Sequence, residues 1–233
     1  MQESIQRALE GLRRGDFVLV YDAPGREGET DLVMASESVT PSAVRTLRQD
    51  AGGLICVTFD ARLDGHLHLP YFDEVLAQAA GTFPTLRALA ANDIRYDARS
   101  SFSLWVNHRE TFTGITDRDR ALTIRRFADF TAKALATENG WAAEAFGKEF
   151  RSPGHVPLVK AAPKLLDERR GHTELVTALV SMAQLIPTAT ICEMMGDDGR
   201  ALSKEDAKGY AAARNLVFLE GSEILEAWRA WSA

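Results

Sequence analysis

The sequence predicts one α+β domain over residues 1–233, with a mixed sheet and flanking helices. Short apolar runs typical of strands and longer stretches with apolar residues three and four apart are both present, but they do not alternate strictly as in a parallel α/β fold. No repeat, low-complexity tract or linker divides the chain. Its 233 residues, 45% hydrophobic and 26% charged, match a globular protein that can enclose a cleft without disulfide bonds.

Spacing, caps and turn residues predict the elements of the first half. Thr40 is suited to cap a helix and Pro41 to occupy its first position. Pro70 and Pro84 interrupt any long element within residues 60–100, which therefore have no clear assignment. In order, we expect a helix over 5–12 that ends at Gly15, strands over 16–22 and 32–36 around an acidic loop, a helix over 40–52, and strands over 53–59 and 103–107.

The second half is expected to hold a helix from about Asp117 and then an irregular region from 138 through the segment RSPGHVPLVKA. Leu175 to Cys192 is uncharged, but its hydroxyl side chains and Pro187 argue against a membrane span and favour a half-buried helix that runs into a strand. The remaining expected elements are a helix from about 173, a strand over 188–194, a helix opened by Ser203 with capping-box spacing to Asp206, a strand over 216–219 and a helix over 222–231.

Charge and cysteine content argue against several classes of protein. The chain carries 27 Lys and Arg against 33 Asp and Glu, and this net charge of −6 makes nucleic acid or an anionic membrane an unsuitable partner. Cys56 and Cys192 each lie in an apolar run, so we expect buried thiols in strands and no disulfide or zinc framework. The start of the chain lacks the apolar core of a signal peptide, and we expect a cytoplasmic protein.

The loop GREGETD, residues 25–31, is the first candidate site. Glu27, Glu29 and Asp31 place three carboxylates within five residues, beside Arg26. Like charges this close repel one another unless a cation or an arginine compensates, so the cluster suits a hard divalent metal ion. A solvated acidic turn is the alternative, and it is common for a loop of this kind.

A second candidate site is the turn Arg169 to Glu174, which directly precedes a predicted helix. Backbone N–H groups at a helix start, a threonine hydroxyl and two guanidinium groups together suit a phosphate group. The imidazole of His172 is also a possible metal ligand. An ordinary capping turn is the alternative.

His155 and Glu193 are the candidates for proton transfer. Prolines at 153 and 157 restrict the backbone around His155 and would hold its imidazole in one orientation, although a rigid surface turn is the alternative. Glu193 ends an apolar strand, where its carboxylate either points to solvent or is buried with a raised pKa, as a general acid or base requires. The sequence has no P-loop, dinucleotide-binding or nucleophile-elbow motif.

These segments together resemble the 3,4-dihydroxy-2-butanone 4-phosphate synthase family of riboflavin biosynthesis. The matching motifs follow the same order over nearly the whole chain, from Asp16 to about Leu219. Each motif alone is weak, whereas the ordered set is specific. The motifs are REGETDLV at 26–33, TGITDRDRALTI at 113–124, RSPGHVPL at 151–158, RGHTE at 170–174 and ICE at 191–193.

The resemblance implies a lyase that converts D-ribulose 5-phosphate to L-3,4-dihydroxy-2-butanone 4-phosphate and formate through a metal-stabilised enediolate. It implies Mg²⁺ or Mn²⁺ held by Glu27 and His172, catalytic roles for His155 and Glu193, and a homodimer with its sites near the interface. The residues that it implies for substrate binding are Arg26, Glu27, Asp31, Thr113, Arg169, Arg170, Gly171, His172, Thr173 and Glu193.

Three positions depart from the common pattern of the family. Thr30 and Arg170 stand where Gly is common, and Asn107 stands where Asp is usual. Arg adopts positive φ less readily than Gly, so the sequence does not determine the backbone conformation of the turn at Arg170. The same side chains would also suit a metal-dependent sugar-phosphate isomerase or aldolase, or a non-catalytic module that binds a phosphorylated ligand. The sequence also leaves open whether His155 or Glu193 takes the first proton.

Overall fold

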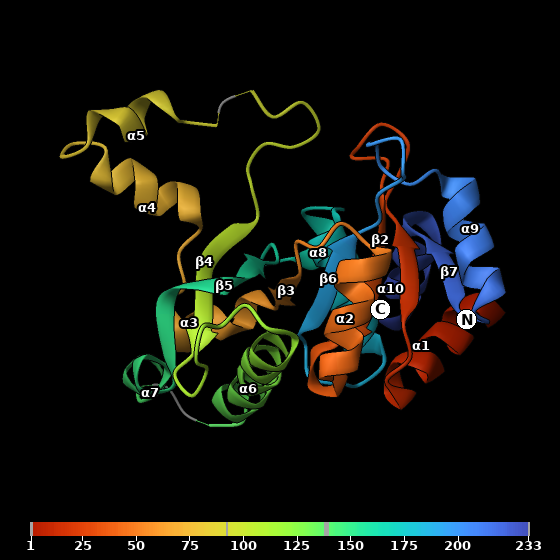
Figure 1. Cartoon of the computed structure of the whole chain (residues 1–233), viewed down its shortest axis with the longest axis horizontal. Coiled ribbons are helices and arrows are strands. Elements are labelled where there is room, and N and C mark those ends of the chain that lie inside the picture. Colours follow the sequence, from red (N-terminus) through yellow and green to blue (C-terminus); the bar gives the residue numbers. More distant parts are fainter. Residues whose placement is uncertain (1, 92, 138–139, 233) are drawn as a thin grey trace.

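The computed structural model describes residues 2–91, 93–137 and 140–232, and it contains a seven-stranded mixed sheet with helices on both faces (Figure 1). The strands are β1 (Val18–Tyr21), β2 (Thr30–Ala35), β3 (Cys56–Phe59), β4 (Phe102–His108), β5 (Phe150–Lys160), β6 (Ala189–Glu193) and β7 (Val217–Glu220). Their order is β4-β5-β3-β6-β2-β1-β7. β1 is parallel to β7 and β3 to β5, whereas the other neighbouring pairs are antiparallel. The predicted α+β class with a mixed sheet is confirmed.

Two apolar cores, one on each face of the sheet, explain why the central strands are buried throughout. Successive residues alternate between the cores, so that Leu19 faces one and Val18 and Val20 face the other. The helices that pack on the second core are α1 (Glu3–Arg14), α8 (His172–Met182) and α10 (Gly221–Trp231), and those that pack on the first are α2 (Pro41–Asp50), α6 (Asp117–Leu135), α7 (Ala142–Glu149) and α9 (Lys204–Ala213).

The predicted helix starts and buried thiols are confirmed. The Thr40 hydroxyl accepts the Ala43 N–H at 3.1 Å at the start of α2, and Ser203 caps α9 in the same way. Cys56 and Cys192 are buried free thiols in β3 and β6. Helix α8 is buried along almost its whole length, not half-buried as predicted, because it lies between the sheet and the helices α1 and α10.

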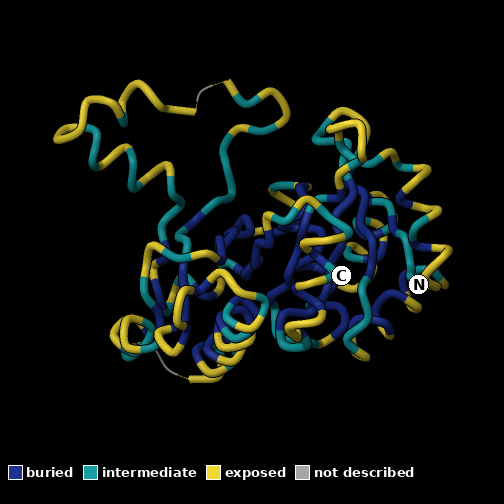
Figure 2. Tube along the Cα trace, viewed as in Figure 1, coloured by how far each residue is buried: buried dark blue, intermediate teal, exposed yellow. Residues whose placement is uncertain are grey.

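Residues 70–91 and 93–101 belong to an arm that projects from the body of the protein (Figure 1). The arm carries α4 (Phe72–Ala79) and α5 (Pro84–Ala88), and neither helix has a buried residue (Figure 2). The short α3 (Asp64–Leu67) precedes it. Helices this short, without a buried face, produce no strong apolar periodicity, which explains why the sequence did not resolve this region.

We predicted an irregular region from residue 138 onward. This prediction is wrong for the described part of the region, because α7 and β5 lie there. Residues 138 and 139 are outside the described residues. The segment RSPGHVPL at 151–158 fits into β5 because the ladder between β4 and β5 is irregular there. Val106 pairs with Val156, whereas Asn107 pairs with Arg151. Residues 152–155 therefore bulge out of the ladder, so Pro153 and Gly154 do not interrupt the strand.

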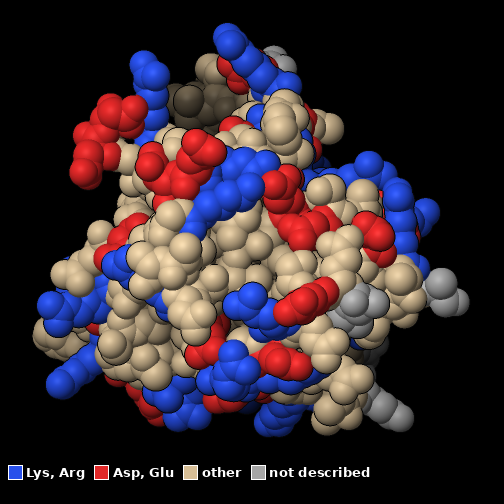
Figure 3. Space-filling model, turned by 90° about the vertical axis from the view of Figure 1, so that its right-hand side faces the viewer, with Lys and Arg blue, Asp and Glu red and all other residues tan. Residues whose placement is uncertain are grey.

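Charged side chains of both signs are interspersed on the face of the molecule shown in Figure 3. This mixed surface agrees with the small negative net charge of the sequence. Over the described ranges, no helix combines the length and apolar character needed to cross a membrane.

Candidate active site

The acidic loop between β1 and β2 is organised by Asp22, which follows the last residue of β1. Its carboxylate accepts the backbone N–H groups of Glu27 at 3.0 Å, Gly28 at 3.0 Å and Glu29 at 3.2 Å. These bonds fold the loop back on the strand end and fix where its side chains emerge. Sequence reasoning did not single out Asp22, although a carboxylate at a strand end beside an acidic loop was an available signal.

The loop meets the start of α8 at His172. Nδ1 of His172 lies 3.1 Å from a Glu27 carboxylate oxygen, and Nε2 lies 3.7 Å from Asp31. His172 and Asp31 are only 5% and 1% exposed. Burial acts to lower the pKa of His172, but the carboxylates of Asp31, Glu27 and Asp22 outweigh it and raise that pKa. Burial raises the pKa of the Asp31 carboxyl well above its ordinary range.

This cluster fits a divalent cation. Asp22, Glu27 and His172 each present a ligand atom within 4.8 Å of the others. Nε2 of His172 and both carboxylate oxygens of Asp31 are buried and have no hydrogen-bond partner among the described residues, and a bound cation would satisfy such groups. Oxygen ligands suit Mg²⁺, and an imidazole also suits Mn²⁺. The predicted ligands Glu27 and His172 therefore lie together, with Asp22 as a further ligand candidate.

Glu193 lies beside this cluster because β6 pairs with β2, where Glu193 and Asp31 are direct partners across the ladder. Burial raises the pKa of the Glu193 carboxyl. Of the two alternatives that the sequence left open, the structure contains the desolvated carboxyl with a raised pKa, which is suited to accept or donate a proton.

Two arginines converge on Asp97 of the arm. Nη2 of Arg26 lies 2.9 Å from Asp97 Oδ2, and Nε and Nη2 of Arg169 lie 2.7 and 2.6 Å from the same oxygen. Arg169 also donates through Nη1 to the fully buried Glu174 at 2.6 Å. Gly171 provides the space for this arrangement, because a Cβ there would lie 2.8 Å from Nη1 of Arg26 and would also overlap Arg169.

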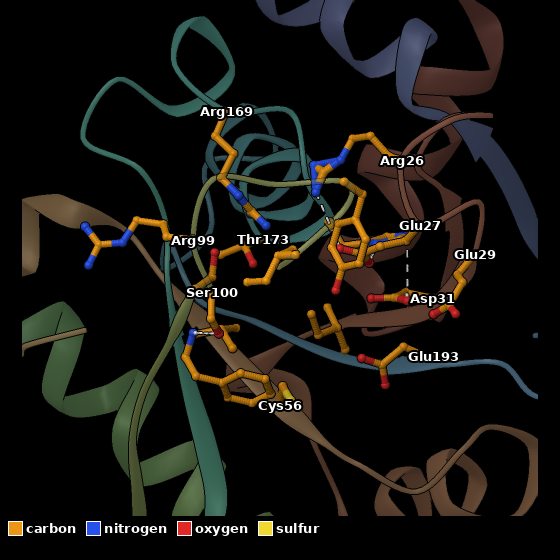
Figure 4. Close-up of a pocket in the computed structure, with 17 residues that line it drawn as sticks. Arg26, Glu27, Glu29, Asp31, Cys56, Arg99, Ser100, Arg169, Thr173 and Glu193 are labelled. Atoms are coloured by element: carbon orange, nitrogen blue, oxygen red, sulfur yellow. Dashed lines mark hydrogen bonds and ion pairs between the residues drawn. The ribbon is translucent and has the colours of Figure 1, made fainter. Parts of the chain in front are cut away.

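One cavity of about 340 Å³ joins Glu27 and His172 of the carboxylate–imidazole cluster to Glu193 and the arginine pair (Figure 4). In Figure 4, Arg26 and Arg169 enter from one side, and Glu27, Asp31 and Glu193 lie along another. The predicted site residues that line the cavity are Arg26, Glu27, Asp31, Arg169, His172, Thr173 and Glu193.

Four predicted site residues are not among those that line the cavity. Gly171 is buried next to the two arginines, and Arg170 is exposed. The backbone at Arg170 does not adopt positive φ, so the replacement of Gly does not strain the turn. Thr113 and His155 instead meet through Asn107, whose Nδ2 lies 3.4 Å from the Thr113 carbonyl oxygen and 3.1 Å from Nδ1 of His155.

The fold and the cavity are those of a small-molecule enzyme, with groups that can bind a cation and transfer a proton. The family model for 3,4-dihydroxy-2-butanone 4-phosphate synthase matches residues 6–227. The chain belongs to this family, and membership supports a role in riboflavin biosynthesis.

Relatives and solved structures agree with this assignment. The 3,4-dihydroxy-2-butanone 4-phosphate synthase of Methanosarcina acetivorans is 50% identical over 233 residues, which are 99% of this chain and 93% of the relative. That of Methanothermobacter thermautotrophicus is 47% identical over 225 residues, or 96% and 95% of the two chains. The Candida albicans synthase structure matches with a TM-score of 0.70 at 29% identity over 95% of each chain. A synthase in complex with two magnesium ions matches with a TM-score of 0.72 at 26% identity, over 96% of this chain and 95% of that one.

Proposed function

We propose that the protein converts D-ribulose 5-phosphate to L-3,4-dihydroxy-2-butanone 4-phosphate and formate, with Mg²⁺ or Mn²⁺. The observation that carries the proposal is the single cavity in which a carboxylate–imidazole cluster, a desolvated carboxyl and two arginines meet. Its volume of about 340 Å³ is within the range of small-ligand sites. The names of the relatives supply the product.

The charges in the cavity orient such a substrate in one direction. Arg169, Thr173 and the backbone N–H groups at the start of α8 favour the phosphate group. Glu27 and His172, with Asp22, would hold the divalent ion near the sugar oxygens. With the substrate in this orientation, Glu193 lies next to its carbon chain, from which the C3 proton must be removed.

The reaction begins when the proton on C3 of the ketose is removed and its electron pair is left in an enediolate. When bound, the divalent ion supplies positive charge that offsets the charge developing on neighbouring substrate oxygens. Loss of the C1 hydroxyl and reprotonation give a diketone, and a carbon shift followed by hydrolysis releases C4 as formate. These steps need proton-handling groups on different sides of the substrate, and we assign them to Glu193 and His155.

The decisive experiment supplies D-ribulose 5-phosphate labelled at C4 together with Mg²⁺ and follows the label by NMR. We expect labelled formate and an unlabelled four-carbon phosphate. An isomerase would retain the label in a pentose phosphate, an aldolase would leave it in a longer fragment, and a binding module would return the substrate. Any of those three results from folded, metal-loaded protein would refute the proposal.

We extend the proposal to a homodimer in which His155 and Thr113 of one protomer complete the cavity of its partner. His155 is exposed and does not line the cavity of its own chain. Close to it in the fold, the loop that carries Thr113 exposes Phe112 by 94% and Ile115 by 49%. Two such apolar side chains beside a catalytic candidate are typical of an interface.

Replacing Phe112 with aspartate should therefore shift the protein from dimer to monomer and lower turnover at least about tenfold, because a charge would be buried at the interface. Light scattering after size exclusion and formate release measure the two effects. Trp231, 46% exposed on α10, offers a matched control, and Trp231→Asp should stay dimeric. A fully active wild-type monomer would contradict the dimer.

The Asp97 carboxylate binds the guanidinium groups of Arg26 and Arg169, to which a phosphate group would also bind. We expect Asp97→Asn to bind inorganic phosphate roughly five- to tenfold more tightly in calorimetry, because a neutral amide competes less well for Arg26 and Arg169 than a carboxylate does. Asp93→Asn is the matched control, because Asp93 is an exposed residue of the same segment and its replacement removes the same charge. Weaker binding by Asp97→Asn would mean that Asp97 only orients the arginines.

A further inference from the structure

Asn107 makes three contacts that together fix the orientation of its side-chain amide. Its Oδ1 accepts the backbone N–H of His155 at 2.8 Å. Its Nδ2 lies 3.1 Å from Nδ1 of the same histidine and 3.4 Å from the carbonyl oxygen of Thr113. The opposite orientation would place the amide oxygen against that carbonyl oxygen and the NH₂ group against the His155 N–H. Two backbone groups therefore determine which end of the amide faces the imidazole.

The orientation of the amide determines the tautomer of His155. The NH₂ group of Asn107 is a donor only, so Nδ1 of His155 has to be the acceptor and carry no proton. A neutral imidazole has one N–H, which must then be on Nε2. Nε2 lies across the ring from Asn107, and His155 is exposed, so this N–H points toward whatever binds there.

We propose that Asn107 is a positioning residue that holds neutral His155 as the Nε2–H tautomer, so that His155 donates a hydrogen bond to a substrate oxygen and does not act as the first base. The catalytic part of this inference rests on the proposed function, whereas the tautomer does not. In this state Nδ1 is engaged and Nε2 is protonated, which leaves the ring without a free lone pair. A neutral imidazole can stabilise an enediolate by donating such a bond.

This assignment answers which group takes the first proton. The C3–H bond of the ketose breaks, its electron pair remains in the enediolate, and the proton goes to a carboxylate oxygen of Glu193. His155 keeps its proton and donates a hydrogen bond from Nε2 to the oxygen on which negative charge develops.

The departure from the family pattern at position 107 provides the matched variant. In Asn107→Asp, the carboxylate can still accept a hydrogen bond from the backbone N–H of His155. It would also accept a hydrogen bond from a protonated Nδ1 of the same histidine. We expect the neutral imidazole to change to the Nδ1–H tautomer, with a lone pair on Nε2. The hydrogen bond from Nε2 to the substrate is then lost and Nε2 can accept a proton instead, so the dependence of kcat on pH should change.

Long-range ¹H–¹⁵N correlation spectra of the full chain, at a pH where an exposed imidazole is neutral, test the tautomer without any turnover. The His155 signal is assigned by its loss in His155→Gln, and His66, His68 and His108 serve as internal references. We expect a protonated Nε2 and an unprotonated Nδ1 in the wild type. A protonated Nδ1, or an equal mixture, would overturn the proposal even if Asn107→Asp fails to fold. An unchanged pH dependence of kcat in a folded variant whose tautomer has switched would overturn the donor role, while release of labelled formate tests the overall reaction separately.

Discussion

Replacing Glu27 with glutamine should weaken Mg²⁺ binding by at least about 10²-fold and abolish most turnover. The amide retains the shape of the side chain but removes a negatively charged ligand from the cluster with Asp22 and His172. Loss of an outer partner of a metal site costs 10- to 100-fold in affinity, and a direct ligand should cost at least as much. Calorimetric titration with Mg²⁺, with Mn²⁺ as a second ion, measures the effect.

Glu29→Gln is the matched control for this result. Glu29 is in the same loop and lines the same cavity, but it is not part of the carboxylate–imidazole cluster. We expect it to retain Mg²⁺ affinity within a few-fold of the wild type. Equal affinity in Glu27→Gln and the wild type would show that the ion does not bind at Glu27.

Much of the site could be predicted because its residues lie on elements with clear local signals. Glu193 ends an apolar strand, and His172 begins a helix after a polar turn. The pairing of β2 with β6 then places Asp31 opposite Glu193. The sequence does not encode this pairing in any local pattern, so their proximity followed only from the family resemblance until the sheet order was known.

The residues that sequence analysis missed act through distant partners. Asp97 is separated from Arg26 and from Arg169 by more than 70 residues, and it lies on an arm without buried helices that could predict its path. Asn107 appeared only as a departure from the family pattern. Its role depends on the bulge that brings His155 next to it. Such contacts depend on the tertiary arrangement, which residue type and spacing do not determine.

The environment of Glu193 predicts how turnover depends on pH. Burial raises the pKa of its carboxyl, and only the deprotonated form can accept a proton from the substrate. Turnover should therefore fall as pH decreases through this raised pKa, and the acid limb of kcat should lie above about 4.3, the ordinary value for glutamate. A profile that stays flat down to that value would show that another group is the base.

Glu193→Gln should lower kcat at least about 10²-fold while the fold and the affinity for inorganic phosphate stay close to those of the wild type. The amide has the size of the carboxyl group but cannot accept the C3 proton, and the arginines that favour the phosphate do not contact it. Rates of formate release and calorimetric titration with phosphate measure the two effects separately. If the base is lost, the remaining turnover should also lose the acid limb. Turnover within a few-fold of the wild type would make Glu193 a structural residue of β6 and place the base elsewhere in the cavity.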